Sequence, residues 1–261
     1  MSHSTGAAPA GRFSCPLPRP DAPLRLFCFP HSGAGPTAFR TWPRLAGEDV
    51  EVHTAVLPGR GERAGEPPAT DWRALVAEFA EAVEQAAGDG ADAAARTVLF
   101  GQSLGAVLAF EVARLLRAAG REPARLVVAG RAAPDVLSRV RLPADDRALV
   151  DHVAARYGGI PDALRAEPEL IAYFARPLRA DLRLAERYAY AEAPPLSAAV
   201  AAFAGEADDT IGPGELERWG AHTTGPFTSL RLPGGHLCSE GNEAVLLAAV
   251  RDSHRSPADA P

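Results

Sequence analysis

Residues 97–106 read TVLFGQSLGA, a short apolar run that ends in Gly-Gln-Ser-Leu-Gly and leads into a helical pattern over 106–119. This G-x-S-x-G spacing is typical of a serine held on a sharp strand-to-helix turn. Gly101 and Gly105 suit that turn because a Cβ at either position would collide with the neighbouring strand or helix. A serine hydroxyl is a weak nucleophile that needs a base and an anion-stabilising pocket beside it. The stretch therefore predicts Ser103 as a nucleophile, and a histidine and an acid are expected elsewhere in the chain.

Composition favours a globular intracellular protein. The chain has 261 residues, of which 47% are hydrophobic, and it carries a net charge of −6 with no run of basic residues interleaved with aromatics. We therefore expect no nucleic-acid partner. Cys15, Cys28 and Cys238 are odd in number and widely spaced, which favours a reduced cytoplasmic protein with no disulfide framework and no metal cluster. Neither a signal peptide nor a long apolar run is present, so no membrane association is expected.

Short apolar runs alternate with helical patterns along most of the chain. We expect strands at 24–29, 50–57, 97–100, 125–129, 199–204 and 227–232, and helices at about 37–45, 71–87, 106–119 and 242–253. Such alternation predicts an α/β fold with a mostly parallel central sheet and helices on both faces.

The pattern changes between residues 132 and 196, where helices begin near 145 and extend over 167–178 and 178–190. We expect a helical insertion at 132–196 that divides the core into 23–131 and 197–254. It is interpreted as a lid over the carboxyl edge of the sheet, with extra packing and no gating role as the alternative. Residues 1–22 and 255–261 are rich in Pro, Ala and Ser and are expected to be flexible tails.

The acid and the histidine are both expected where strands end. Asp208 follows the penultimate strand, and His236 follows the last strand on a Gly-Gly turn. The order Ser103, Asp208, His236 is that of the α/β-hydrolase fold, with His236 as base and Asp208 orienting it. Asp209 is the alternative acid.

Other residues could compete for these roles. The competing histidines are His31, His53, His152 and His222, although a lone histidine is more often packed or solvated. Cys238 lies two residues beyond His236, and we interpret it as a packing residue because nothing near it in the sequence lowers the pKa of its thiol.

A glycine-rich loop, residues 30–35, follows the first expected strand. In this fold such a loop provides the second backbone donor to the oxyanion, beside the N–H of the residue after the nucleophile. We expect these donors to be Ser32 N–H and Leu104 N–H, with an ordinary glycine turn as the alternative. His31 borders the loop and is a candidate substrate contact.

With these residues in place, the chain resembles the type II thioesterases, the stand-alone editing enzymes of polyketide synthases and nonribosomal peptide synthetases. The matching segments are 29–35 with Phe39 and Trp42, 57–63 with 66–68, 101–106, 178–182, 205–208 and 234–236. The resemblance covers about residues 24–250. Two segments depart from it: Gln102 stands where the family usually has His, and Ser32-Gly33-Ala34 where it has Ala-Gly-Gly. Gln102 is therefore a candidate substrate contact that tunes the pocket.

The resemblance implies hydrolysis of aberrant or stalled acyl groups from the phosphopantetheine arm of acyl or peptidyl carrier proteins, through an acyl-serine. It implies no metal or other cofactor, and a monomer is expected. Two alternatives stay open. One is a chain-releasing thioesterase or small-molecule esterase, and the other is a carrier-protein-binding module whose catalysis is vestigial.

Overall fold

The computed structural model describes residues 11–88, 90, 92–136 and 142–251. Its strands are β1 (Phe13–Ser14), β2 (Leu24–Phe29), β3 (Val50–Ala55), β4 (Thr97–Gln102), β5 (Arg125–Ala129), β6 (Ala199–Gly205) and β7 (Phe227–Leu232). They form one sheet in the order β1-β3-β2-β4-β5-β6-β7, in which only β1 is antiparallel to its neighbour. This confirms the predicted α/β-hydrolase fold with a mostly parallel sheet.

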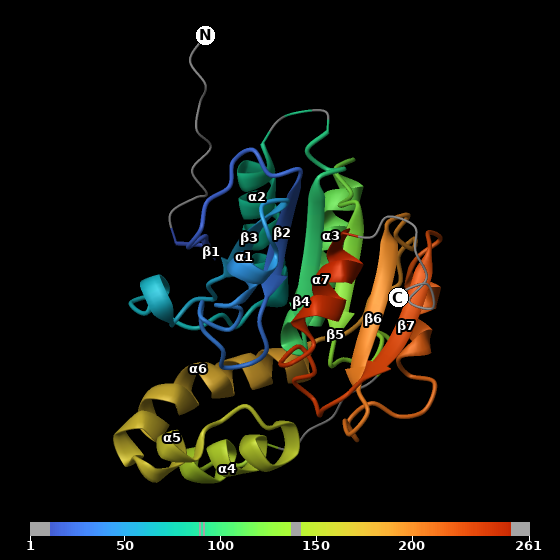
Figure 1. Cartoon of the computed structure of the whole chain (residues 1–261). Coiled ribbons are helices and arrows are strands. Elements are labelled where there is room, and N and C mark those ends of the chain that lie inside the picture. The colour runs from blue at the N-terminus through green and yellow to red at the C-terminus, as the bar shows by residue number, and fades with distance from the viewer. Residues whose placement is uncertain (1–10, 89, 91, 137–141, 252–261) are drawn as a thin grey trace.

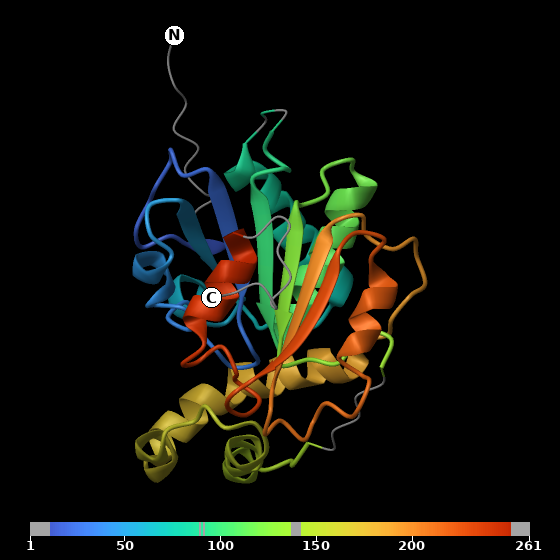
Figure 2. The same cartoon turned by 45° about the vertical axis from the view of Figure 1, so that its right-hand side comes forward.

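Helices cover both faces of this sheet, as Figures 1 and 2 show. α2 (Trp72–Ala87) and α3 (Leu104–Ala118) pack together on one face, and α1 (Trp42–Leu45) and α7 (Glu243–Arg251) lie on the other. Two short 3₁₀ turns, η1 (Gly61–Arg63) and η2 (Glu217–His222), lie in the connections. Within the described residues, no helix combines the length and the apolar character needed to span a bilayer.

The burial of the central strands explains their sequence. Successive side chains of a strand point to opposite faces. In β4, Leu99 joins the core under α2 and α3, whereas Val98 and Phe100 join the core under α1 and α7. Because both faces are covered, the strand is a continuous apolar run and does not alternate with polar residues.

The predicted flexible tail at 1–22 is wrong for residues 11–22. Phe13 pairs with Ala55 across the β1–β3 ladder and is only 5% exposed. Its ring lies 5.0 Å from that of Phe27 and 5.5 Å from that of Phe79. Residues 1–10 and the expected tail at 255–261 lie outside the described residues. The strand could not be predicted from the sequence, because a single aromatic residue in a proline-rich segment produces no periodic pattern.

The insertion between β5 and β6 contains α4 (Asp146–Tyr157), α5 (Asp162–Ala166) and α6 (Pro168–Arg187), which lie across the carboxyl ends of the strands (Figure 1). The two helices predicted at 167–178 and 178–190 are one continuous helix that contains Pro177. Proline removes one helical hydrogen bond. Here the buried face of Ile171, Ala175 and Leu178 packs against α4 and keeps the helix continuous.

The helix predicted at about 37–45 is shorter than expected. Only Trp42–Leu45 is helical. The preceding residues form successive four-residue turns, in which Ala38 N–H donates to Gly35 O and Arg40 N–H donates to Thr37 O.

We predict that Phe13→Ala lowers the free energy of unfolding by about 3 kcal/mol, because it removes a buried ring that touches two others. Leu17→Ala is the matched control, since Leu17 is 39% exposed, and it should change stability by less than about 0.5 kcal/mol. Denaturant unfolding measures both. Equal effects would show that β1 adds little to the core.

Candidate active site

Ser103 stands on strained backbone between β4 and α3. Its φ is 55° and its ψ −115°, and it is the one non-glycine residue with positive φ in the described part of the chain. A Cβ at Gly101 would lie 2.1 Å from Gly105 O, and one at Gly105 would lie 2.0 Å from Phe29 O. Both expected collisions are confirmed. The close backbone contacts hold the turn that lifts the Ser103 side chain above the sheet.

The structure brings Ser103, Asp208 and His236 together. His236 Nε2 lies 2.8 Å from Ser103 Oγ, and His236 Nδ1 lies 3.0 Å from Asp208 Oδ2. Asp208 is buried, whereas Asp209 is exposed and makes no bond to the imidazole in the described structure. Of the two candidate acids, only Asp208 can therefore orient His236.

Thr210 completes the acid's surroundings, and sequence reasoning missed it. Its N–H and its hydroxyl donate to Asp208 Oδ1 at 3.0 and 2.6 Å, and its Oγ1 lies 3.2 Å from His236 Nδ1. Burial raises the pKa of Asp208, but hydrogen bonds from His236 and Thr210 outweigh burial, and the net pKa is lowered. Asp208 is thus ionised and accepts the Nδ1 proton, which leaves Nε2 free to accept from Ser103. The Asp-x-Thr spacing of residues 208–210 could have indicated this role from the sequence, because side chains at this spacing bond locally to one another.

The other histidines have different surroundings. His53 bonds to Glu51 at 2.8 Å, and His222 bonds to Asp135 at 3.1 Å. His152 lies on α4 and does not line the cavity described below. His31 borders Ser32, and the pKa of its imidazole falls to about 4 because of burial, His236 and Arg60. His31 is therefore neutral at pH 7.

Cys238 is not a nucleophile. It is 1% exposed and belongs to the core under α7. Burial, followed by the charge of Asp208, raises the pKa of its thiol to about 11. The predicted packing role is confirmed.

The expected oxyanion donors lie beside the nucleophile. Ser32 and Leu104 both line the cavity next to Ser103. Leu104 is the first residue of α3, so its N–H has no intrahelical acceptor. A helix N-terminus also favours negative charge.

The donor loop is held by a buried ion pair that sequence reasoning did not identify. Asp181 on α6 accepts from Gly33 N–H at 2.8 Å and from two nitrogens of Arg60 at 2.7 Å each. Arg60 also donates to Ala34 O at 3.1 Å. Both charged side chains are nearly inaccessible. Gly33 adopts φ +79°, and a Cβ there would lie 2.9 Å from Leu178. The insertion therefore touches the donor loop directly.

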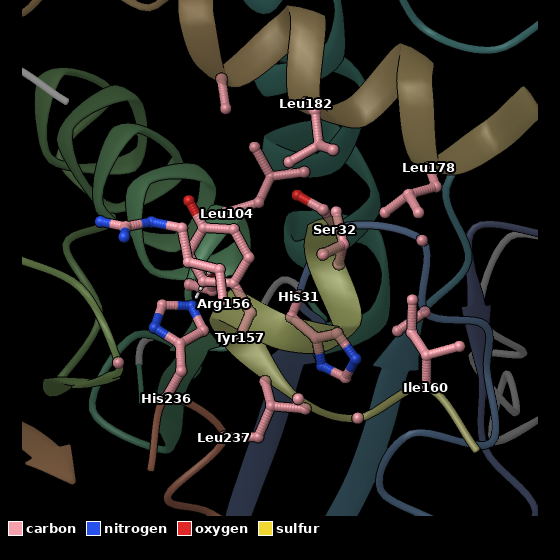
Figure 3. Close-up of a pocket in the computed structure, with 18 of the residues that line it drawn as sticks. His31, Ser32, Leu104, Arg156, Tyr157, Ile160, Leu178, Leu182, His236 and Leu237 are labelled. Carbon is pink, nitrogen blue, oxygen red and sulfur yellow. Dashed lines mark hydrogen bonds between the residues drawn. The ribbon is translucent and has the colours of Figure 1, made fainter. Parts of the chain in front are cut away.

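The site opens into a cavity of about 770 Å³, within the range of small-molecule sites. Figure 3 shows His31, Ser32, Leu104 and His236 around one end, with Leu178 and Leu182 pointing in from α6. Tyr157, at the end of α4, places its ring 4.7 Å from the His236 ring. Residues from the insertion thus cover His236 and form much of an apolar wall.

The expectation that Gln102 contacts substrate is not supported by its position. Gln102 is 1% exposed and is not among the residues that line the cavity. Its Oε1 accepts from the Ser239 hydroxyl at 2.7 Å. The last residue of β4 points away from the cavity because strand side chains alternate, and Ser103 takes the open side.

One group in the described structure has metal-ligand chemistry, namely Cys15, Glu51 and His53, whose ligand atoms lie within 4.8 Å of one another. Glu51 already accepts from His53 and from Arg19 N–H, and Arg25 lies 3.5 Å away. The hydrogen bond from His53 is the main cause that lowers the pKa of Glu51 to about 2. Because these donors already satisfy the hydrogen-bonding capacity and the charge of the Glu51 carboxylate, we assign no metal to the group.

Comparisons with known proteins agree with this geometry. A family model described as "Thioesterase domain" matches residues 24–249. The chain is 33% identical to Thioesterase PikA5 of Streptomyces venezuelae over 84% of its own length and 77% of the relative's. Among solved structures it is similar to RedJ, a thioesterase from the prodiginine pathway of Streptomyces coelicolor (37% identity, TM-score 0.80, 93% and 88% coverage). It is also similar to BorB, a type II thioesterase from the borrelidin cluster (29% identity, TM-score 0.80, 98% and 100% coverage).

We predict that Asp181→Asn destabilises the protein by about 3 kcal/mol, because it leaves the buried Arg60 without a counter-charge. Asp146→Asn is the matched control: Asp146 pairs with Arg179 from α6 as well, but its side chain is 52% exposed, so the loss should stay below about 1 kcal/mol. Denaturant unfolding compares the two. Similar losses would contradict a structural role for the buried pair.

His31 should make stability depend on pH. Its folded pKa of about 4 lies below the ordinary 6.5, so the unfolded chain binds more protons between these values. The contribution of neutral His31 to the free energy of unfolding is then fully present above about pH 6.5 and is lost as the pH decreases toward 4. We predict that His31→Asn reduces the stability difference between pH 7 and pH 4.5 by about 2 kcal/mol. An unchanged difference, measured by unfolding at both pH values, would contradict the assignment.

Proposed function

The chain belongs to the thioesterase family, and from this premise we propose that it is a stand-alone type II thioesterase. It would hydrolyse aberrant or stalled acyl groups on the carrier proteins of a polyketide or nonribosomal peptide assembly line. The observation that carries the proposal is the hydrogen-bonded series Ser103–His236–Asp208 at the end of an apolar cavity. The names of the relatives, which include a type II thioesterase from a biosynthetic cluster, support this substrate class.

The proposed acylation follows from the hydrogen bonds. His236 Nε2 removes the proton from Ser103 Oγ, which attacks the thioester carbonyl. Asp208 accepts the Nδ1 proton and stabilises the imidazolium. The carbonyl oxygen becomes an oxyanion, to which Ser32 N–H and Leu104 N–H donate. The carbon–sulfur bond then breaks, and the sulfur takes the proton from His236 and leaves as a thiol, which returns the imidazole to its neutral form.

Deacylation repeats these roles with water. His236 removes a proton from water, which attacks the acyl-serine, and Ser103 leaves as a hydroxyl after His236 returns the proton. A thiolate is a good leaving group that needs little protonation. The reaction therefore requires only a positioned base and two backbone donors, and we propose that no metal or other cofactor takes part.

The cavity suits a short acyl chain at the end of a phosphopantetheine arm. Its walls include apolar residues of the insertion, such as Leu178 and Leu182 (Figure 3), and Ser103 lines it as well. In this proposal the arm enters beneath the insertion, which acts as a lid, and the partner is an acyl or peptidyl carrier protein. A cytoplasmic location and a monomeric state stay predictions.

The test is the release of a short acyl group, such as acetyl, from a holo carrier protein. Ser103→Ala should abolish release, and Asp208→Asn should lower kcat by about 10³–10⁴ because the imidazole loses its orienting acid. Asp209→Asn is the matched control and should stay close to wild type, since Asp209 is exposed. Release by Ser103→Ala at the wild-type rate would overturn the proposal.

Substrate preference distinguishes the alternatives. The editing role predicts a higher kcat/KM for an acyl group on a carrier protein than for the same acyl group on coenzyme A or for an aryl ester. Preference for the aryl ester would indicate a small-molecule esterase.

A further inference from the structure

The active-site cavity contains an arginine for which the mechanism has no use. Arg131 follows β5 and lines the cavity. Its neighbour Gly130 lies so close to the catalytic histidine that a Cβ there would be 2.4 Å from His236 O. Gly130 N–H donates to Phe203 O at 2.9 Å, and the buried Trp219 donates to Arg131 O at 2.9 Å. The backbone of Arg131 is thus held firmly beside the reaction centre.

Among the described residues, the guanidinium of Arg131 has no counter-charge. It makes no hydrogen bond or ion pair with any residue that the structure describes. Burial lowers its pKa, and the ionisable groups that oppose this shift are phenols, those of Tyr157 and Tyr188, and not carboxylates. Its side chain is only partly exposed.

The carboxylates in this region bond elsewhere. Asp135 bonds to Arg218 and His222. Glu111 accepts from Arg114 at 2.8 Å and from the Tyr188 hydroxyl at 2.6 Å. Glu215, which lines the cavity, accepts from Gly212 N–H at 2.7 Å. The remaining charged residues of the cavity wall are exposed, namely Arg40, Arg156, Glu186 and Glu240.

A cation withdrawn from water without a partner is costly, and an anion in the cavity would offset that cost. A carboxylate is the best complement, because the planar guanidinium donates to its two oxygens in parallel. Ala132, Val136 and Ile211 line the same cavity, so this anion would have few competing polar contacts.

We propose that Arg131 is a specificity-determining residue that binds a carboxylate on the acyl chain. The enzyme then hydrolyses thioesters of dicarboxylic acids in preference to uncharged acyl thioesters of the same length. This inference rests on the proposed thioesterase function. The phosphate of the phosphopantetheine arm is the other source of an anion. The pantetheine chain separates this phosphate from the thioester, whereas Arg131 follows Gly130, which lies against the backbone of His236.

The experiment compares succinyl and butyryl thioesters of N-acetylcysteamine, which have four acyl carbons each and no phosphate. In wild type, kcat/KM should be higher for the succinyl thioester. Arg131→Met should lower the succinyl-to-butyryl ratio of kcat/KM by about ten-fold or more, and Arg131→Lys should restore part of it because it keeps the charge but not the paired donors. Hydrolysis of the butyryl thioester measures the proposed thioesterase activity separately. A fall in the succinyl-to-butyryl ratio without a fall in butyryl hydrolysis therefore concerns only the role of Arg131.

Arg156→Met is the matched control, since it removes an exposed cation from the same cavity wall. The ratio should not change. An unchanged ratio in Arg131→Met, or an equal fall in Arg156→Met, would overturn the proposal. So would an effect of Arg131→Met that occurs only with substrates carrying the phosphate.

A second measurement does not depend on the folding of a variant. Free succinate should inhibit wild-type hydrolysis of the butyryl thioester competitively and at a lower concentration than butyrate does. Equal inhibition by the two acids would also overturn the proposal.

Discussion

The left-handed backbone at Ser103 is the constraint on which the site depends. A side chain at φ 55° is strained by about 1–3 kcal/mol. The strain persists because Gly101 and Gly105 let strand and helix approach more closely than a Cβ would allow, and because Ser103 N–H bonds to Ala129 O. The same turn starts α3 at Leu104, so one local geometry positions both the hydroxyl and a backbone donor.

The partners of Ser103 arrive through close contacts at the ends of other strands. Gly205 ends β6, and a Cβ there would lie 2.1 Å from Gly235 O, next to His236. This contact brings the loop after β6 against the loop after β7. Asp208 and His236 are therefore neighbours although 28 positions separate them. Parallel strands place these loops at one edge of the sheet, which is where α/β proteins bind ligands.

The insertion contacts the loop of the candidate site directly and does not only cover it. Asp181 holds Gly33 N–H and Arg60 at once, and Leu178 fills the space beside the glycine. A displacement of α6 would therefore disturb the loop that contains Ser32. Hydrophobic packing alone would allow the two elements to slide, whereas a buried, bidentate ion pair requires one arrangement. The donor loop and the insertion are consequently coupled.

Sequence reasoning predicted Ser103, Asp208 and His236 as one site because strand ends, glycine spacing and residue order are local signals, and the structure brings the three side chains together. The alternation of apolar runs likewise determined the parallel sheet and the place of the insertion. Tertiary structure decided what depends on distant partners. It selected Asp208 over its neighbour by burial, it made Phe13 part of the core, and it turned Gln102 away from the cavity. Within the part of the chain that the structure describes, it also left Arg131 without a counter-charge. A sequence pattern records which faces are apolar, but only the packed chain decides which charges find partners.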